Sequence, residues 1–274
     1  MIVNWRTTGL TMTSVVIVCC APALQARAET KPPVECGAVQ IVDSATTLEQ
    51  LPASLPAITA VSYTKRGDQL QQEKNYDQAI ACYTDAIDAN PDYAVAYSHR
   101  GIAYYQKEDY DRAIADQTKA IELEPTEFRY YVNRGNAHRA KGDLARAIAD
   151  HSKAIELRPD HGGGYNGRCL ARAQSGEGLA VITDCDRAIQ LLPGVAALYD
   201  TRGYAYLRAG KFQQAIADYD QALKLSPQLP ESLFGRGVAK RRLGQTAVGD
   251  ADIAAAQKAD PRIVQKMAKV GIVP

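Results

Sequence analysis

Small and apolar residues recur along most of the chain at a fixed interval of 34 residues. From residue 60 onward, each interval holds two stretches of helical length in which these residues are spaced three and four positions apart. The two stretches meet at a turn that contains glycine in several copies, such as Gly210. A proline follows the second stretch and prevents the helix from continuing. The pattern predicts a series of helix hairpins.

Three series of single residues fix the register of these hairpins. They are Gly67, Gly101, Gly135, Gly203 and Gly237, with Cys169 at the sixth position; Pro91, Pro125, Pro159, Pro193, Pro227 and Pro261; and Ala86, Ala120, Ala154, Ala188, Ala222 and Ala256. A strict period over this length is typical of a solenoid, whose units bury their faces against their neighbours. We expect six copies, at residues 60–93, 94–127, 128–161, 162–195, 196–229 and 230–263.

The copies resemble the tetratricopeptide repeat. The fifth copy carries the family's aromatic, small and closing residues at Tyr199, Gly203, Tyr206, Ala215, Tyr219, Ala222 and Pro227. The resemblance implies an all-α, right-handed solenoid of antiparallel helix hairpins, in which the first helices line a concave surface that binds a partner. Apolar residues in the last stretch, residues 264–274, predict a short C-terminal capping helix.

The chain departs from the family where a leucine usually precedes the glycine. That position holds Arg66, Arg100, Arg134, Arg168, Arg202 and Arg236, and the second stretches of copies two to six carry Asp116, Asp150, Asp184, Asp218 and Asp252. Repeated Arg–Asp ion pairs, within or between hairpins, are the structural interpretation. A ligand-binding row of arginines is the alternative. Cys82 replaces the aspartate in copy one, so we expect Arg66 to be freer than the others.

The N-terminal residues differ from the repeats. Arg6 is followed by an apolar stretch and by small residues that end at Ala28, which is typical of a cleaved signal peptide over residues 1–28. We therefore expect an exported protein, periplasmic or secreted. An uncleaved anchor that tethers an envelope assembly component to the membrane is the alternative. Residues 29–59 contain four prolines and predict a tether or a partly ordered segment.

Charge and motifs restrict the function further. Lysine and arginine total 32 against 31 acidic residues, and this balance argues against nucleic-acid binding. We find no phosphate-binding loop, nucleophile elbow or zinc-helix motif, and no cofactor or small-molecule substrate is indicated. The sequence therefore predicts a non-catalytic scaffold that binds a protein or peptide partner.

The concave surface is the candidate binding site. Its expected residues are Tyr105, Arg129, Asn133, Asn136, Arg139, Tyr204, Arg208, Phe234 and Arg241. Exposed tyrosine and phenylalanine beside arginine are residue types that anchor interfaces.

Copy four has two cysteines in place of a small and a large residue. Cys169 stands at the glycine position and Cys185 at the aromatic position of the second helix, so the two should face each other. We predict a disulfide between them. Two unpaired buried thiols, or a metal or redox site that includes His151, are the alternatives. Whether Cys36 and Cys82 pair is left open.

Overall fold

The computed structural model describes residue 36 and residues 55–274. The expected signal peptide, residues 1–28, and most of the expected tether lie outside the described residues. Thirteen α-helices and one 3₁₀ turn, but no strand, occur in the described part of the chain. Within each of the two compact units given below, consecutive helices pack against each other, which agrees with the predicted all-α solenoid.

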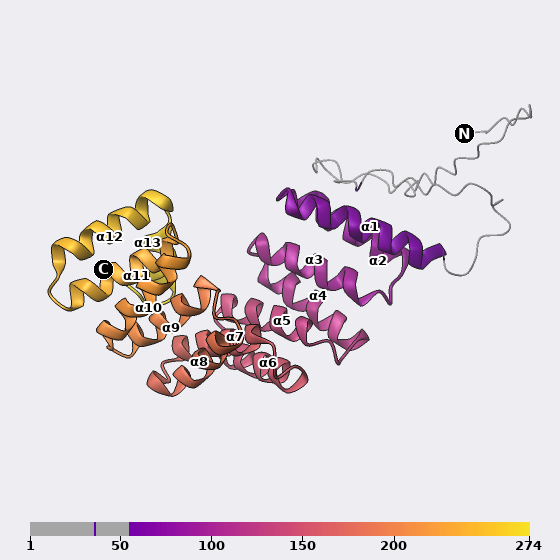
Figure 1. The fold of residues 1–274 in the computed structure, drawn as a ribbon. Coiled ribbons are helices and arrows are strands. Elements are labelled where there is room, and N and C mark those ends of the chain that lie inside the picture. The colour runs from indigo at the N-terminus through magenta and orange to yellow at the C-terminus, as the bar shows by residue number, and fades with distance from the viewer. Residues whose placement is uncertain (1–35, 37–54) are drawn as a thin grey trace, which may run out of the picture. The chain divides into compact units, whose positions relative to one another are not determined.

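Twelve of the helices form six hairpins, one for each predicted copy (Figure 1). The pairs are α1 (Leu55–Gln72) with α2 (Tyr76–Ala89), α3 (Ala94–Gln106) with α4 (Tyr110–Leu123), α5 (Phe128–Lys141) with α6 (Leu144–Leu157), α7 (Gly162–Ser175) with α8 (Ile182–Leu191), α9 (Ala196–Arg208) with α10 (Phe212–Leu225), and α11 (Pro230–Arg242) with α12 (Thr246–Ala259). The predicted cap is α13 (Ile263–Lys269).

The chain divides into two compact units, Met1–Leu123 and Glu124–Pro274. The first contains the hairpins α1–α2 and α3–α4, and the second contains the four remaining hairpins and α13. Each unit is described by itself below.

The turn inside every hairpin depends on one residue with a positive φ. These residues keep the 34-residue period: Lys74, Glu108, Gly142, Gly176, Gly210 and Gly244 have φ values between 60° and 90°. A left-handed residue after a helix ends its hydrogen-bond ladder and turns the chain back, and glycine adopts it without strain. Copy four has a second such residue, Gly178, where four of the other second helices begin with a large residue and the sixth copy has Thr246. Its first turn is accordingly the 3₁₀ segment Gly178–Val181, and α8 is shortened.

The glycines inside the first helices permit close packing. The ring of Tyr219 in α10 lies between Gly203 of its own hairpin and Gly235 of the next, and a Cβ at either glycine would collide with it or press tightly against it. His151 lies in the same way between Gly135 and Gly167. In copies three and five, the ring of the second helix therefore packs between two glycines of successive first helices.

The predicted Arg–Asp pairs are confirmed in all five hairpins. Nε and Nη2 of the arginine donate to the two carboxylate oxygens of the aspartate at 2.6–2.9 Å in Arg100–Asp116, Arg134–Asp150, Arg168–Asp184, Arg202–Asp218 and Arg236–Asp252. The aspartates are buried. This bidentate geometry is the strongest form of the pair, and it joins the two helices of one hairpin.

The same arginines also join successive hairpins. Nη1 donates to the second helix of the preceding hairpin at 2.6–3.2 Å in Arg100–Thr84, Arg168–Ser152, Arg202–Asp186 and Arg236–Asp220. In four hairpins a tyrosine three residues earlier lies beside the guanidinium, at 5.7–5.9 Å from the ring centroid. Each of the arginines that reach the preceding hairpin therefore connects three helices: its own, the second helix of its hairpin and the second helix of the hairpin before.

Replacement of Arg202 by methionine should destabilise the protein, because Asp218 would keep a buried charge with no cation opposite it. We expect a loss of about 3 kcal/mol in the free energy of unfolding, measured by urea denaturation followed by circular dichroism. Arg66→Met is the matched control, since Arg66 is exposed and Cys82 occupies its aspartate position; its loss should stay below about 0.5 kcal/mol. Equal losses in the two variants would contradict the role assigned to the pair.

Candidate partner-binding surface

The first helices form the inside of each unit. Within the second unit, α5, α7, α9 and α11 pack against one another in series, and in the first unit α1 packs against α3. Successive second helices of the same unit make no such contact in the described chain. Because the first helices are closer together, their free face is concave. We call this face the inner surface.

One ion pair shows which side chains reach the inner surface. His99 Nδ1 of α3 lies 2.7 Å from an Asp68 carboxylate oxygen of α1, and Tyr83 Oη also donates to that oxygen at 2.9 Å. Burial opposes ionisation of Asp68, but these hydrogen bonds and the charge of His99 outweigh it, and the pKa of the carboxyl is lowered. Asn136 and Tyr204 occupy the position of Asp68 two and four periods further along.

The C-terminal segment covers the inner surface at α9 and α11. Tyr204 Oη and Arg208 Nη1 of α9 both donate to the backbone oxygen of Val270, at 2.8 and 3.3 Å. The core cluster that contains Tyr204 and Phe234 also contains Ile263, Met267 and Ile272. The sequence predicted a cap at this end of the chain, but not that the cap would reach back to α9.

Two predicted binding residues are therefore not exposed. Tyr204 retains 4% and Phe234 0% of its accessible surface, so the expectation that they are open to a partner is wrong for this structure. The physical reason is that the C-terminal segment buries the apolar part of the inner surface. Arg208 is exposed, but it is held by the Val270 carbonyl.

Two further predicted arginines have acidic neighbours of their own. Arg129 is bound by Glu127 through two nitrogens, at 2.7 and 3.0 Å, at the start of α5. Arg241 Nε lies 3.5 Å from Asp250 of α12, the second helix of the same hairpin. Both guanidinium groups therefore already have an acidic neighbour within the chain.

The predicted residues that stay available lie mainly on α5. Asn133, Asn136 and Arg139 are partly exposed there, and Tyr105 of the first unit is partly exposed beside Tyr110. Arg139 Nε and Asn166 Oδ1, from the adjacent helices α5 and α7, are buried atoms with no hydrogen-bond partner in the described structure. Buried polar groups are normally paired, and these two atoms lack such a partner among the described residues.

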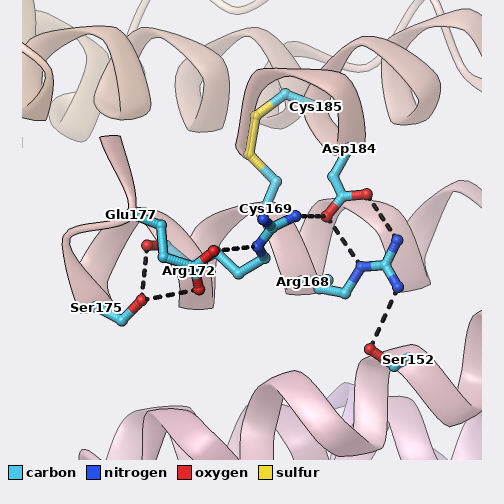
Figure 2. A network of polar contacts seen from close by, with 8 residues as sticks. All are labelled: Ser152, Arg168, Cys169, Arg172, Ser175, Glu177, Asp184 and Cys185. Carbon is cyan, nitrogen blue, oxygen red and sulfur yellow. Dashed lines mark hydrogen bonds and ion pairs between the residues drawn. A yellow bond between two sulfur atoms is a disulfide. The ribbon is translucent and has the colours of Figure 1, made fainter. Parts of the chain in front are cut away.

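Copy four carries additional polar and covalent ties (Figure 2). Arg168 binds Asp184 and Ser152, as the period requires, and Arg172 adds a second cation to Asp184 at 3.1 Å. Arg172 Nε also donates to Glu177 at 2.7 Å. The turn that contains Gly176 and Gly178 is thereby attached to the helix pair.

The predicted Cys169–Cys185 disulfide is present, with a Cα–Cα distance of 5.5 Å, and both cysteines are buried. The next first helix has Thr201 where Gly167 and Gly235 face the rings of His151 and Tyr219. A smaller residue in the second helix is thus matched by a larger one in the following first helix. Cys36 and Cys82, which the sequence left open, are also joined, with a Cα–Cα distance of 4.5 Å.

Comparison with known families agrees with this geometry. Profiles described as tetratricopeptide repeat match residues 64–127 and 128–161, and one described as TPR repeat matches residues 203–244; together they cover more than half of the chain. The chain is a tetratricopeptide repeat protein.

Solved structures share the fold at low identity. A chain of the APC/C hetero-tetramer Cut9-Hcn1 has a TM-score of 0.70 and 16% identity, over 77% of this chain and 42% of that one. The type IV pilus biogenesis factor PilW has a TM-score of 0.67 and 17% identity, over 76% and 98%. The Pseudomonas aeruginosa pilF structure has a TM-score of 0.62 and 14% identity, over 78% and 99%. This tetratricopeptide chain spans less than half the length of the Cut9-Hcn1 chain. No curated protein sequence shows significant similarity.

His151 is a deeply buried ionisable group of the repeats. Its side chain is fully buried, and neither ring nitrogen has a partner among the residues described. Burial, with the nearby charges of Arg139 and Arg168, lowers the pKa of the imidazole to about 4. His151 therefore packs as a neutral ring in the aromatic position of the tetratricopeptide pattern.

Neither a membrane-spanning helix nor a cluster of metal ligands occurs in residue 36 and residues 55–274. None of the helices there has the length and hydrophobicity of a membrane span. No group of three or more potential metal ligands lies together in that part of the chain. The metal alternative for copy four also conflicts with the bond between its two sulfur atoms.

The disulfide in copy four should be measurable as stability. In a Cys36→Ser/Cys82→Ser background, reductant should lower the free energy of unfolding by about 3 kcal/mol, the value for closing a loop of about 15 residues in the chain-entropy model. Adding Cys169→Ala/Cys185→Ala should abolish the response to reductant. Mass spectrometry of the oxidised protein should show a linked pair, and free thiols at both positions would contradict the prediction.

His151 should make the protein sensitive to acid. Its pKa is about 6.5 when unfolded and about 4 when folded, so the unfolded chain binds more protons between these values. Stability should therefore fall as the pH falls through this window, by up to about 3 kcal/mol from this residue. His151→Phe should remove that share of the loss in denaturant titrations at pH 7 and pH 4.

Asp200 acts in the opposite direction, because burial raises its pKa to about 6. Asp200 is present in both the wild type and His151→Phe, so its contribution cancels when the pH dependence of the two proteins is compared. An unchanged pH dependence in His151→Phe would show that the imidazole is not the group responsible.

Proposed function

We propose that this protein is an exported, non-catalytic scaffold that binds a segment of a partner protein on the inner surface of α5 and α7. The observation that carries the proposal is the pair of buried, unpartnered atoms Arg139 Nε and Asn166 Oδ1 on adjacent first helices. They lie in the same unit as Asn133 and Asn136, which remain partly exposed. Tetratricopeptide repeats serve generally as binding modules without catalysis.

The chemistry of these residues suits a peptide backbone. An asparagine amide offers both donors and an acceptor, and can therefore pair with the N–H and the carbonyl of an extended segment. Arg139 adds a donor and a positive charge, which favours a carbonyl or carboxylate of the partner. A segment that satisfies the two buried atoms would replace a desolvation cost with hydrogen bonds.

Export is supported by the leader-like residues 1–28 and by the cysteines. Both pairs outside that leader are joined as disulfides, and disulfides persist in oxidising compartments. Cys36 is joined to a buried position of α2, which attaches the segment ahead of the repeats to the first hairpin.

The binding surface can be tested by capture from an envelope or medium extract with the immobilised protein. Asn133→Ala/Asn136→Ala/Arg139→Ala should reduce recovery of the specific partner at least tenfold in quantitative mass spectrometry. Arg146→Ala/Lys153→Ala/Glu156→Ala is the matched control: it removes three polar side chains, of which Arg146 and Glu156 are exposed and Lys153 is partly exposed, from the second helix of the same hairpin. The mature chain used should begin at Glu29.

Retention of every partner by the inner-surface variant would refute the proposed site. Equal losses in both triple variants would assign the effect to α5–α6 stability instead, which thermal unfolding of each variant would reveal. A mature chain that begins at Met1 would refute cleavage of the leader but would not affect the binding result.

A further inference from the structure

The C-terminal segment extends further than an end cap requires. A solenoid end needs a cover for its last hairpin, and α13 supplies this by packing on α11 and α12. The residues after α13 continue to α9, one hairpin earlier, where Tyr204 and Arg208 bind the Val270 carbonyl across 66 and 62 residues of sequence. The hairpin of α9 is already covered by the next one, so capping does not explain this contact.

The segment is shaped to lie on this part of the inner surface. Gly271 has a φ of 79°, and a Cβ at this residue would collide with the guanidinium of Arg208. This glycine turns the chain so that Ile272 packs into the same core as Met267, and the Ile272 N–H donates to the Met267 carbonyl at 2.9 Å. Glycine adopts this left-handed turn without strain, and it lets the flexible Arg208 side chain approach the backbone closely.

The segment contacts the inner surface as a bound peptide would. It offers a short helix with apolar side chains at Ile263 and Met267, a further one at Ile272, and a carbonyl between them that accepts two hydrogen bonds. The surface offers apolar side chains from α9 and α11, of which Phe234 and Val238 are buried. Helix-in-groove recognition uses this combination of apolar anchors and polar contacts.

We infer that residues 263–272 are an intramolecular ligand that closes the α9–α11 part of the inner surface, and that a partner segment of the same chemistry competes with it. The inference rests on the proposed function, because it adds a second, regulated part to the same surface. The competing segment carries three apolar side chains with the spacing of Ile263, Met267 and Ile272. It also has an unpaired backbone carbonyl at the position that corresponds to Val270. A tethered ligand acts at a high effective concentration, so it weakens competitors without any change in the surface.

The probe is a fluorescein-labelled synthetic peptide of residues 260–274, whose binding is followed by anisotropy up to millimolar protein. Met267→Asp/Ile272→Asp in the full chain should displace the segment and increase peptide affinity at least tenfold over the wild type. Ala268→Asp/Val273→Asp is the matched control. It places the same charges one residue further along, at exposed positions, and should bind the peptide as weakly as the wild type.

Two further variants keep the test decisive. A chain that ends at Arg262 retains all six hairpins and should bind the peptide as the displaced variant does, whether or not the aspartate variant folds. Tyr204→Phe in that shortened chain should weaken peptide binding several-fold, because it removes the donor to the Val270 carbonyl. Equal peptide affinity of the shortened and full chains would overturn the inference and leave the segment a structural cap.

This test does not depend on the proposed function. The peptide assay requires no natural partner, so its failure would leave a capture result on α5 and α7 intact. Conversely, absence of a partner on α5 and α7 would not prevent the peptide from binding α9 and α11.

Discussion

The fold depends on an arginine that satisfies a buried aspartate in five of the six hairpins. The buried Asp218 carboxylate accepts two hydrogen bonds from the Arg202 guanidinium, and removal of that cation would leave a buried charge without its bidentate partner. The same guanidinium has a third nitrogen, which in Arg100, Arg168, Arg202 and Arg236 reaches the preceding hairpin. One side chain therefore fixes the pairing of two helices and their register on the preceding hairpin. A leucine at this position could pack, but it could not specify that register.

The two disulfides occur in copies one and four, which depart from the common repeat in different ways. Copy one lacks the aspartate, and Cys82 at that position binds Cys36 instead. Copy four keeps its Arg168–Asp184 pair, but it lacks the glycine and the ring that pack together in copies one, three and five, and Cys169–Cys185 joins the two positions instead. Covalent closure thus compensates for packing that the sequence no longer supplies. Thr201 fills the space that a ring at position 185 would have taken.

The features predictable from the sequence are those that the repeat samples several times. Facing positions could be identified for the arginine and aspartate, and for Cys169 and Cys185, because each column occurs in every hairpin. The exposure of Tyr204 and Phe234 was predicted wrongly because their cover comes from a segment with no repeated counterpart. The partner of Arg129 was detectable, since Glu127 lies two residues earlier at the helix start. The contact of Val270 with Tyr204 joins residues 66 positions apart, so no local sequence pattern could predict it.

The division of the inner surface follows from what each part would cost if left open. Around α9 and α11 the first helices present aromatic and aliphatic side chains, and exposure of these to water is unfavourable at roughly 25 cal/mol per Å². The chain covers them with its own Ile263, Met267 and Ile272. Around α5 the side chains are amides and a guanidinium, which water can solvate except at buried atoms such as Arg139 Nε. A partner therefore gains most on α5 and α7 by completing hydrogen bonds, and on α9 and α11 only by matching the apolar contacts already made.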